Sequence, residues 1–196
     1  MLHNEPLVRL DGRERNLLSV SPKVNTKSYH DAFMKMPVPK PVAEAAYIQA
    51  GWILQKADGK DEEYLVAIDA RTGTLIADNL GRKGHPRNTA FNGEELRALR
   101  AHSKDVITIH NHPHSWEPSY RDVMTASRNA MVAGSVIVAH DGGVWYISAS
   151  TSIVADELRR LYNHMKNEVG DKAEFRALER LIGRARRVGL TWLKLR

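Results

Sequence analysis

The feature that most constrains this chain is an apolar, β-branched run that ends in closely spaced histidines. Residues 105–110 read DVITIH, a pattern typical of a buried β-strand, with His110 at its end. His112 follows two positions later, and Pro113 then stops the strand because proline has no backbone N–H. Successive side chains of a strand point to opposite faces, so we expect His110 and His112 on one face and Asn111 on the other.

The segment after this strand adds a hydroxyl and a carboxylate. Ser119 suits the N-cap of a helix predicted over residues 120–133 and closed by Gly134. Asp122 lies in the first turn of that helix, and it can turn back toward the histidines if helix and strand pack together. Two imidazoles and one carboxylate match the three-ligand set of a catalytic zinc site, in which water takes the fourth position. Zinc would lower the pKa of that water to about 7.

The absence of cysteine bears on the type of site. With no Cys in 196 residues, a metal must be held by His, Asp or Glu, and disulfides are excluded. No stretch approaches the roughly 18 apolar residues of a membrane span. The N-terminus also lacks the pattern of a signal peptide. We therefore expect a cytoplasmic protein without membrane contact, built as a single domain with extensions.

Strands and helices interleave along the sequence, which predicts an α/β (α+β) fold with a mixed sheet flanked by helices. Residues 1–40 include SPKVNTKS and lead into the proline-rich MPVPKPV at residues 36–42, and they are expected to form an irregular N-terminal extension. From Val42 the composition predicts a helix that runs into a strand near Gly51. These residues begin the core domain, which we place at residues 41–150.

Two hairpins and one further helix are predicted within this core. The first hairpin joins an apolar run at residues 64–68 to TLIAD through a turn at Gly73. The second is SVIVAHDGGVWYISAS, in which two β-rich runs flank Asp-Gly-Gly. Between them, FNGEELRALRAHS predicts a short helix with Asn92 as its cap and Glu95 three positions later.

Residues 151–196 are predicted to form basic helices. They hold 11 Lys and Arg against 6 Asp and Glu, and so carry most of the formal charge of +6. Their apolar residues recur at helical spacing. Two interpretations stay open: the basic side chains bind nucleic acid electrostatically, or they form the solvated face of amphipathic helices that pack on the core.

The stretch HNHPHSWEPSYRD resembles the signature of the JAMM, or MPN+, zinc metalloprotease family: His-x-His-Pro, a short loop, then Ser-x-x-Asp. Its opening is most similar to the bacterial and phage branch, which includes RadC-like proteins and JAB domains. The order of strand, hairpin, helix, metal loop and helix over residues 60–148 is similar as well. The loop is one residue shorter than is usual, and it carries His114, Trp116 and Glu117 in place of small residues, which suggests a different substrate cleft.

The resemblance implies an MPN/JAB-like fold and assigns roles to residues. His110, His112 and Asp122 would be the Zn²⁺ ligands, and Ser119 would steady the tetrahedral intermediate. The family also uses a glutamate at the start of an early strand as general base. Glu63 is the first choice here, with Glu62 and Glu44 as alternatives.

The implied function is hydrolysis of a peptide or isopeptide bond in a protein or peptide, with ubiquitin-like tails among the candidate substrates. A homodimer stays open. The alternative is a RadC-like nucleic-acid-associated protein, or a phage or mobile-element assembly factor, whose basic tail binds DNA or RNA. The string HNH does not indicate a nuclease, because HNH nucleases spread those residues over a ββα unit. His85, His140 and His164 are expected to be ordinary polar residues, and His114 could contact substrate.

Overall fold

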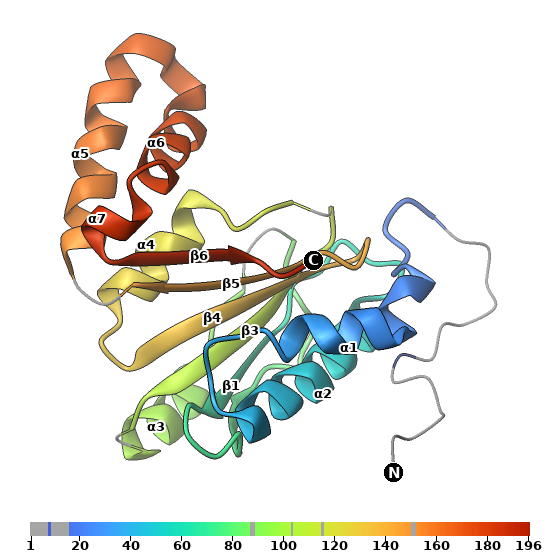
Figure 1. Cartoon of the computed structure of the whole chain (residues 1–196). Helices are drawn as coiled ribbons and strands as arrows, with labels where there is room; N and C mark the ends of the chain where they lie inside the picture. Colours follow the sequence, from blue (N-terminus) through green and yellow to red (C-terminus); the bar gives the residue numbers. More distant parts are fainter. Residues whose placement is uncertain (1–7, 9–15, 87–88, 103, 115, 150–151) are drawn as a thin grey trace.

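The computed structural model describes residues 8, 16–86, 89–102, 104–114, 116–149 and 152–196. It confirms the expected mixed α/β architecture, a sheet with helices on both faces (Figure 1). The strands of the described chain are β1 (Leu65–Asp69), β2 (Leu75–Asp78), β3 (Val106–His112), β4 (Val132–Ala139), β5 (Val144–Ala149) and β6 (Leu190–Lys194). Their order in the sheet is β2-β1-β3-β4-β5-β6. Only β3 and β4 are parallel neighbours; the other described pairs are antiparallel.

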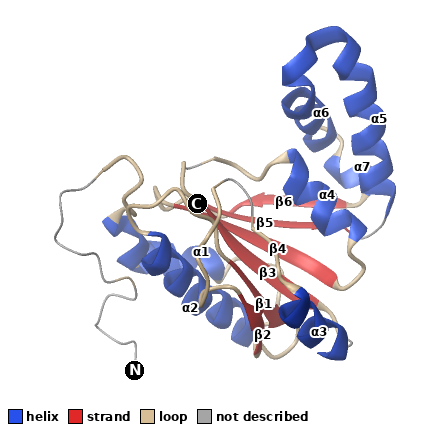
Figure 2. Ribbon diagram, turned by 180° about the vertical axis from the view of Figure 1, so that it is seen from behind, coloured by secondary structure: helices blue, strands red, loops and turns tan. Residues whose placement is uncertain are grey.

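The helices divide between the two faces of the sheet (Figure 2). The α-helices are α1 (Lys27–Phe33), α2 (Lys40–Ala57), α3 (Gly93–His102), α4 (Tyr120–Arg128), α5 (Ser152–Val169), α6 (Ala173–Ile182) and α7 (Ala185–Val188). Two 3-10 turns, η1 (Pro22–Asn25) and η2 (Gly170–Lys172), precede α1 and α6. Helices α1 and α2 cover one face, and α3 and α4 lie on the other, while α5 and α6 form a hairpin that projects beyond the sheet. None of the helices in the described ranges combines the length and apolarity needed to cross a lipid bilayer.

Strand alternation separates two main apolar clusters. One lies between the sheet and α1 and α2, and includes Ile107 and Ile109 of β3 with Ile53 and Leu54 of α2. The other packs α4, α5 and α6 against the opposite face of β4 and β5. The C-terminal helices therefore share a core with the sheet, which agrees with the amphipathic interpretation of their sequence.

Several local predictions are confirmed. Both hairpins form, as β1–β2 and β4–β5. Helix α3 begins after Asn92, whose Oδ1 accepts the backbone N–H of Glu95 at 3.0 Å, while the Glu95 carboxylate accepts the N–H of Asn92 at 2.6 Å. This reciprocal pair is the capping box that the sequence predicted.

Two predictions in the N-terminal half are wrong. The segment before residue 40 is not irregular throughout, because η1 and α1 form there and bury Tyr29 and Phe33 against α2; residues 1–7 and 9–15 lie outside the described chain. Helix α2 also does not give way to a strand at Gly51, but continues to Ala57. Its apolar residues keep helical spacing across that glycine, so the packed face of the helix outweighs the low propensity of one residue.

Two further predictions are wrong in the C-terminal half. Helix α4 ends at Arg128, and Gly134 lies in β4 instead of closing the helix. A Cβ at Gly134 would come within 2.5 Å of the Tyr146 hydroxyl, so the glycine makes room for a neighbouring strand. The chain also does not end in helices: β6 pairs with β5 through residues such as Trp192, opposite Ile147.

Candidate metal centre

Strand β3 brings both predicted histidines to one place. The even-numbered residues of β3 face α3 and α4, where Val106, Thr108, His110 and His112 line one cavity. His110 and His112 are 7% and 6% exposed, and their Nε2 atoms lie 3.2 Å apart. Asn111 is fully buried and points to the other face, toward Tyr64. The alternation predicted from sequence is therefore confirmed.

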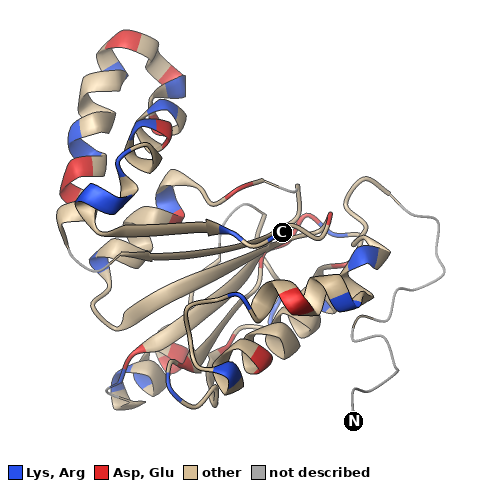
Figure 3. Cartoon of the chain, in the orientation of Figure 1, with Lys and Arg blue, Asp and Glu red and all other residues tan. Residues whose placement is uncertain are grey.

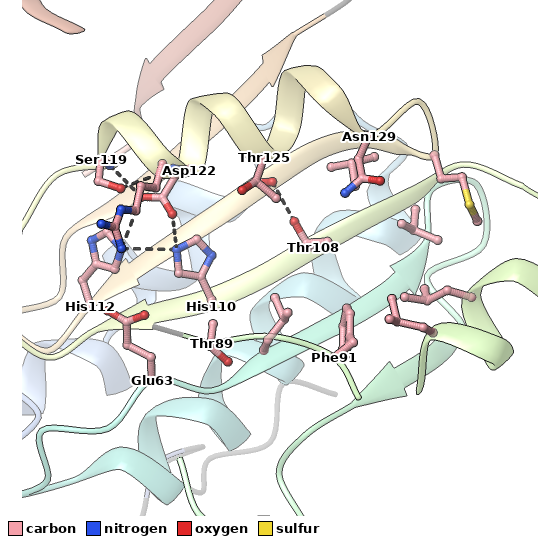
Figure 4. A pocket seen from close by; sticks show the side chains of 18 of the residues that line it. Glu63, Thr89, Phe91, Thr108, His110, His112, Ser119, Asp122, Thr125 and Asn129 are labelled. Atoms are coloured by element: carbon pink, nitrogen blue, oxygen red, sulfur yellow. Dashed lines mark hydrogen bonds and ion pairs between the residues drawn. The ribbon is translucent and has the colours of Figure 1, made fainter. Parts of the chain in front are cut away.

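Asp122 approaches the histidines from the first turn of α4. A helix that connects two parallel strands starts near the carboxyl end of the first strand, and this geometry places Asp122 over the end of β3. Its Oδ1 lies 3.2 Å from His110 Nε2, and its Oδ2 lies 3.4 Å from His112 Nε2 (Figure 4). One ligand atom from each of the three residues lies within 4.8 Å of the other two. The group could therefore hold a metal ion.

A backbone carbonyl orients one of the imidazoles. His112 Nδ1 lies 3.0 Å from the carbonyl oxygen of Trp116. A carbonyl can only accept, so Nδ1 carries the hydrogen and the lone pair of a neutral ring resides on Nε2, which faces the group. Metal-ligating histidines commonly use such an outer hydrogen bond. The sequence singled out Trp116 only as an unusual loop residue; its carbonyl could not be assigned to His112 without the fold.

The electrostatics of the group suit a cation. Burial alone would raise the pKa of the Asp122 carboxyl, but the charges and hydrogen bonds of His110 and His112 outweigh it and hold that pKa well below its usual range. Burial alone would lower the pKa of His112, yet the hydrogen bond and charge of Asp122 leave it above its usual value. Protons and a metal ion therefore compete for the same nitrogen.

Ser119 occupies the N-cap of α4, as predicted. Its Oγ accepts the backbone N–H of Asp122 at 3.3 Å, and its own N–H donates to Asp122 Oδ2 at 2.6 Å. The hydroxyl is an acceptor in this bond, so its hydrogen stays available for a group in the cavity that Ser119 lines.

The three glutamates considered as general base lie in different places. Glu63 lines the cavity and points toward the imidazoles from the segment just before β1 (Figure 4). Burial raises the pKa of its carboxyl, and the nearby His110 and His112 offset only part of this. Glu62 instead accepts a hydrogen bond from the Tyr64 hydroxyl, and Glu44 on α2 lies 3.0 Å from His30 Nε2. Of the three, the structure brings Glu63 to the candidate centre.

The centre occupies one end of a cavity of about 600 Å³. From the histidines, the cavity follows β3 between α3 and α4. Its lining combines apolar side chains with hydroxyl and amide groups. The apolar lining residues include Leu65, Phe91, Leu96 and Leu99, and the polar ones include Thr108, Thr125 and Asn129. The cavity thus provides room for a ligand that extends well beyond the metal group.

Other predicted groups lie away from the three ligands. His114 stacks on Trp116 and lies 2.9 Å from Asp61 Oδ1, on the loop that follows β3. Along α5 and α6, Lys and Arg alternate with Asp and Glu (Figure 3). Glu157, for example, pairs with both Arg160 and Arg184. Nucleic-acid binding by these helices stays a prediction.

Comparison with protein-family models, with curated proteins and with solved structures found no match in any of the three.

Proposed function

We propose that the protein is a zinc-dependent hydrolase of the JAMM type, which cleaves peptide or isopeptide bonds. The observation that carries this proposal is the convergence of His110, His112 and Asp122 at the end of a large cavity, with the Glu63 carboxylate beside them. Each of these side chains lies where the role that the family resemblance assigns to it would require. The proposal therefore joins two independent arguments, one from the sequence signature and one from geometry.

The donor set favours zinc among the common metal ions. Two imidazole nitrogens and one carboxylate suit Zn²⁺, whereas Mg²⁺ and Ca²⁺ prefer shells made of oxygen. The two Nε2 atoms are 3.2 Å apart, and the hydrogen on His112 Nδ1 leaves its Nε2 as a lone-pair donor. A cation among the three ligands would accept this lone pair together with lone pairs from His110 and the Asp122 carboxylate. Three protein ligands also match the composition of catalytic zinc sites, which keep one position open.

The chain supplies the proton transfer and the oxyanion contact. A bound zinc ion contributes Lewis acidity, which makes water nucleophilic near neutral pH. Glu63 would take the proton from that water and pass it to the leaving amine, a role for which its raised pKa is suited. Ser119 would donate its hydroxyl hydrogen to the oxygen that gains negative charge.

The cavity supports a peptide as substrate. An extended peptide presents both side chains and backbone amides, and the cavity lining offers apolar side chains for the former and hydroxyl and amide groups for the latter. Leu65 and Phe91 would contact side chains, and Thr108 and Thr125 could bond to amides.

Metal analysis and peptide cleavage test the proposal together. The 196-residue chain dialysed against zinc should retain about one ion per chain, and Asp122→Ala should lose it, while Asp156→Ala on the exposed surface of α5 should keep it. The zinc-loaded protein should generate new N-termini in a proteome-derived peptide mixture analysed by mass spectrometry, and Asp122→Ala should not. A folded wild type that retains no zinc, or that binds zinc and cleaves no peptide or isopeptide-linked ubiquitin chain, would refute the proposed function.

A further inference from the structure

The backbone pairing of β1 and β3 ends at Leu65, two residues short of Glu63. The antiparallel ladder reaches the pair Leu65 and His110 and goes no further toward the metal group. Beyond it, Glu63 donates its backbone N–H to the carbonyl oxygen of His85 at 3.1 Å, on the side away from β3. The peptide that carries Glu63 thus separates from the strand that carries the histidines. Something other than backbone pairing must hold the two together.

The Asn111 side chain spans this gap. Its Oδ1 accepts the backbone N–H of Tyr64 at 2.8 Å, and its Nδ2 donates to the backbone carbonyl of Glu62 at 2.9 Å. These two groups belong to the residues immediately before and after Glu63. Asn111 is 0% exposed; its bond to Tyr64 is buried and its bond to Glu62 is partly buried. Loss of the first bond would leave the buried N–H of Tyr64 without this partner.

His140 determines which way the Asn111 amide points. His140 Nδ1 lies 2.6 Å from the Leu18 carbonyl oxygen, so this nitrogen carries the hydrogen. Nε2 of the neutral ring is then an acceptor, and it lies 3.2 Å from Asn111 Nδ2. The second N–H of the amide therefore points to His140. The amide oxygen is left for Tyr64, which is the orientation that the bonds to both peptides require.

We propose that Asn111 is a positioning residue, which holds the Glu63 carboxylate beside the metal ligands by fixing the peptide on both sides of it. The inference rests on the proposed function. Strand β3 carries the two histidine ligands on one face and Asn111 on the other, so a displacement of β3 moves His110, His112 and the Glu63 peptide together. Placement matters because a shift of about 1 Å can cost on the order of a hundredfold in rate.

Amide hydrogen exchange measured by NMR on the metal-free protein tests the clamp directly. In Asn111→Ala the Tyr64 amide should exchange at least tenfold faster, while the Leu65 amide changes less than threefold. Asn79→Ala is the matched control, because the Asn79 side chain accepts the N–H of Leu65 at 2.7 Å. This variant should accelerate exchange of the Leu65 amide and leave exchange of the Tyr64 amide unchanged. Unchanged Tyr64 exchange in Asn111→Ala, or equal acceleration throughout β1, would overturn the proposal. If Asn111→Ala does not fold, His140→Ala replaces it, because His140 orients the Asn111 amide. The Tyr64 amide should then exchange at least threefold faster than in wild type. An unchanged rate would contradict the proposal.

Cobalt(II), used as the probe metal, separates positioning from a purely structural role. Asn111→Ala should bind one cobalt with an affinity within threefold of wild type, and its visible spectrum should move toward that of Glu63→Gln. Asn79→Ala should keep the wild-type spectrum. A wild-type spectrum in Asn111→Ala would overturn the positioning role while leaving the metal site intact. If the wild type binds no cobalt or zinc, the proposed function fails, and the exchange experiment alone decides whether Asn111 holds the Glu63 peptide.

Discussion

The backbone N–H of Ser119 donates a hydrogen bond to Asp122 Oδ2 at 2.6 Å, and this bond aims the carboxylate at the two histidines. The same carboxylate lies 3.2 Å from His110 Nε2 through its other oxygen. One aspartate therefore closes the cap of α4 and completes the candidate metal group. A helix N-terminus favours a negative charge at this position, so both roles stabilise the ionised form.

We expect substitutions of Ser119 to distinguish the effect of its backbone N–H, which orients Asp122, from that of its hydroxyl. Ser119→Ala keeps the backbone N–H that orients Asp122, so zinc affinity should stay within a few-fold of wild type. Ser119→Pro removes that N–H at a position whose φ of −87° is close to that of proline, and affinity should fall about 10- to 100-fold. Zinc titration against a chelator of known affinity measures both. Equal affinity in the two variants would show that the 2.6 Å bond does not orient the ligand.

Zinc affinity should fall as the pH is lowered. The pKa of His112 lies above its usual value of 6.5, so protons compete with the metal from a higher pH than at an ordinary histidine. The pKa of Asp122 lies well below its usual range, so that carboxylate stays ionised throughout. Chelator competition between pH 8 and 5.5 should show a loss approaching about tenfold per pH unit on the acid side. A flat profile would contradict the assignment of His112 as a ligand.

The stability of the metal-free protein should depend on pH in the opposite direction. A group whose pKa is higher in the folded than in the unfolded state stabilises the fold below the unfolded value and loses that contribution as pH rises through the folded value. His112 is such a group. Wild type should therefore lose stability relative to His112→Gln as the pH rises above about 6.5, as measured by urea unfolding with a chelator present. If the free energy of unfolding of wild type and His112→Gln changed equally with pH, His112 would be excluded as the source of the pH dependence.

Glu63→Gln should abolish proton transfer without removing the metal. The substitution preserves the size of the side chain, and Glu63 is not among the three ligands. Turnover of a cleaved peptide should drop by about 10²- to 10⁴-fold while zinc content stays at about one per chain. Glu44→Gln, on α2, is the control and should keep wild-type turnover. Similar rates for the two variants would exclude Glu63 as the base.

The C-terminal hairpin should contribute to the stability of the whole protein. Leu158 of α5 is 0% exposed and packs in the cluster shared with α4 and β5. Leu158→Ala should lower the free energy of unfolding by about 2–5 kcal/mol in a single transition. Ile153→Ala, on the same helix but 58% exposed, should change it by less than about 0.5 kcal/mol. If the main unfolding transition of Leu158→Ala had the same free energy as that of wild type, the α5–α6 hairpin would fold separately from the sheet.

Local patterns predicted much of the site because its parts lie close in sequence. The two-residue period of a strand places His110 and His112 on one face, and the capping preference of Ser119 starts α4. Only a short loop separates these elements. The position of Asp122 beside the histidines follows once the helix and the strand pack together. The same reasoning failed at Gly51, where burial of the helix face outweighed the local preference.

The sequence by itself therefore determined the two hairpins, the histidine-bearing strand and the cap of the helix that carries Asp122. Only the tertiary structure showed that Glu63, and neither Glu62 nor Glu44, lines the cavity of the candidate centre, added β6 to the sheet and gave Asn111 its partners. Asn111 and Glu62 are 49 residues apart, and His140 and Leu18 are 122 apart. No local propensity encodes such contacts, because they form only when the apolar faces of distant segments pack together and leave their polar groups to pair with one another.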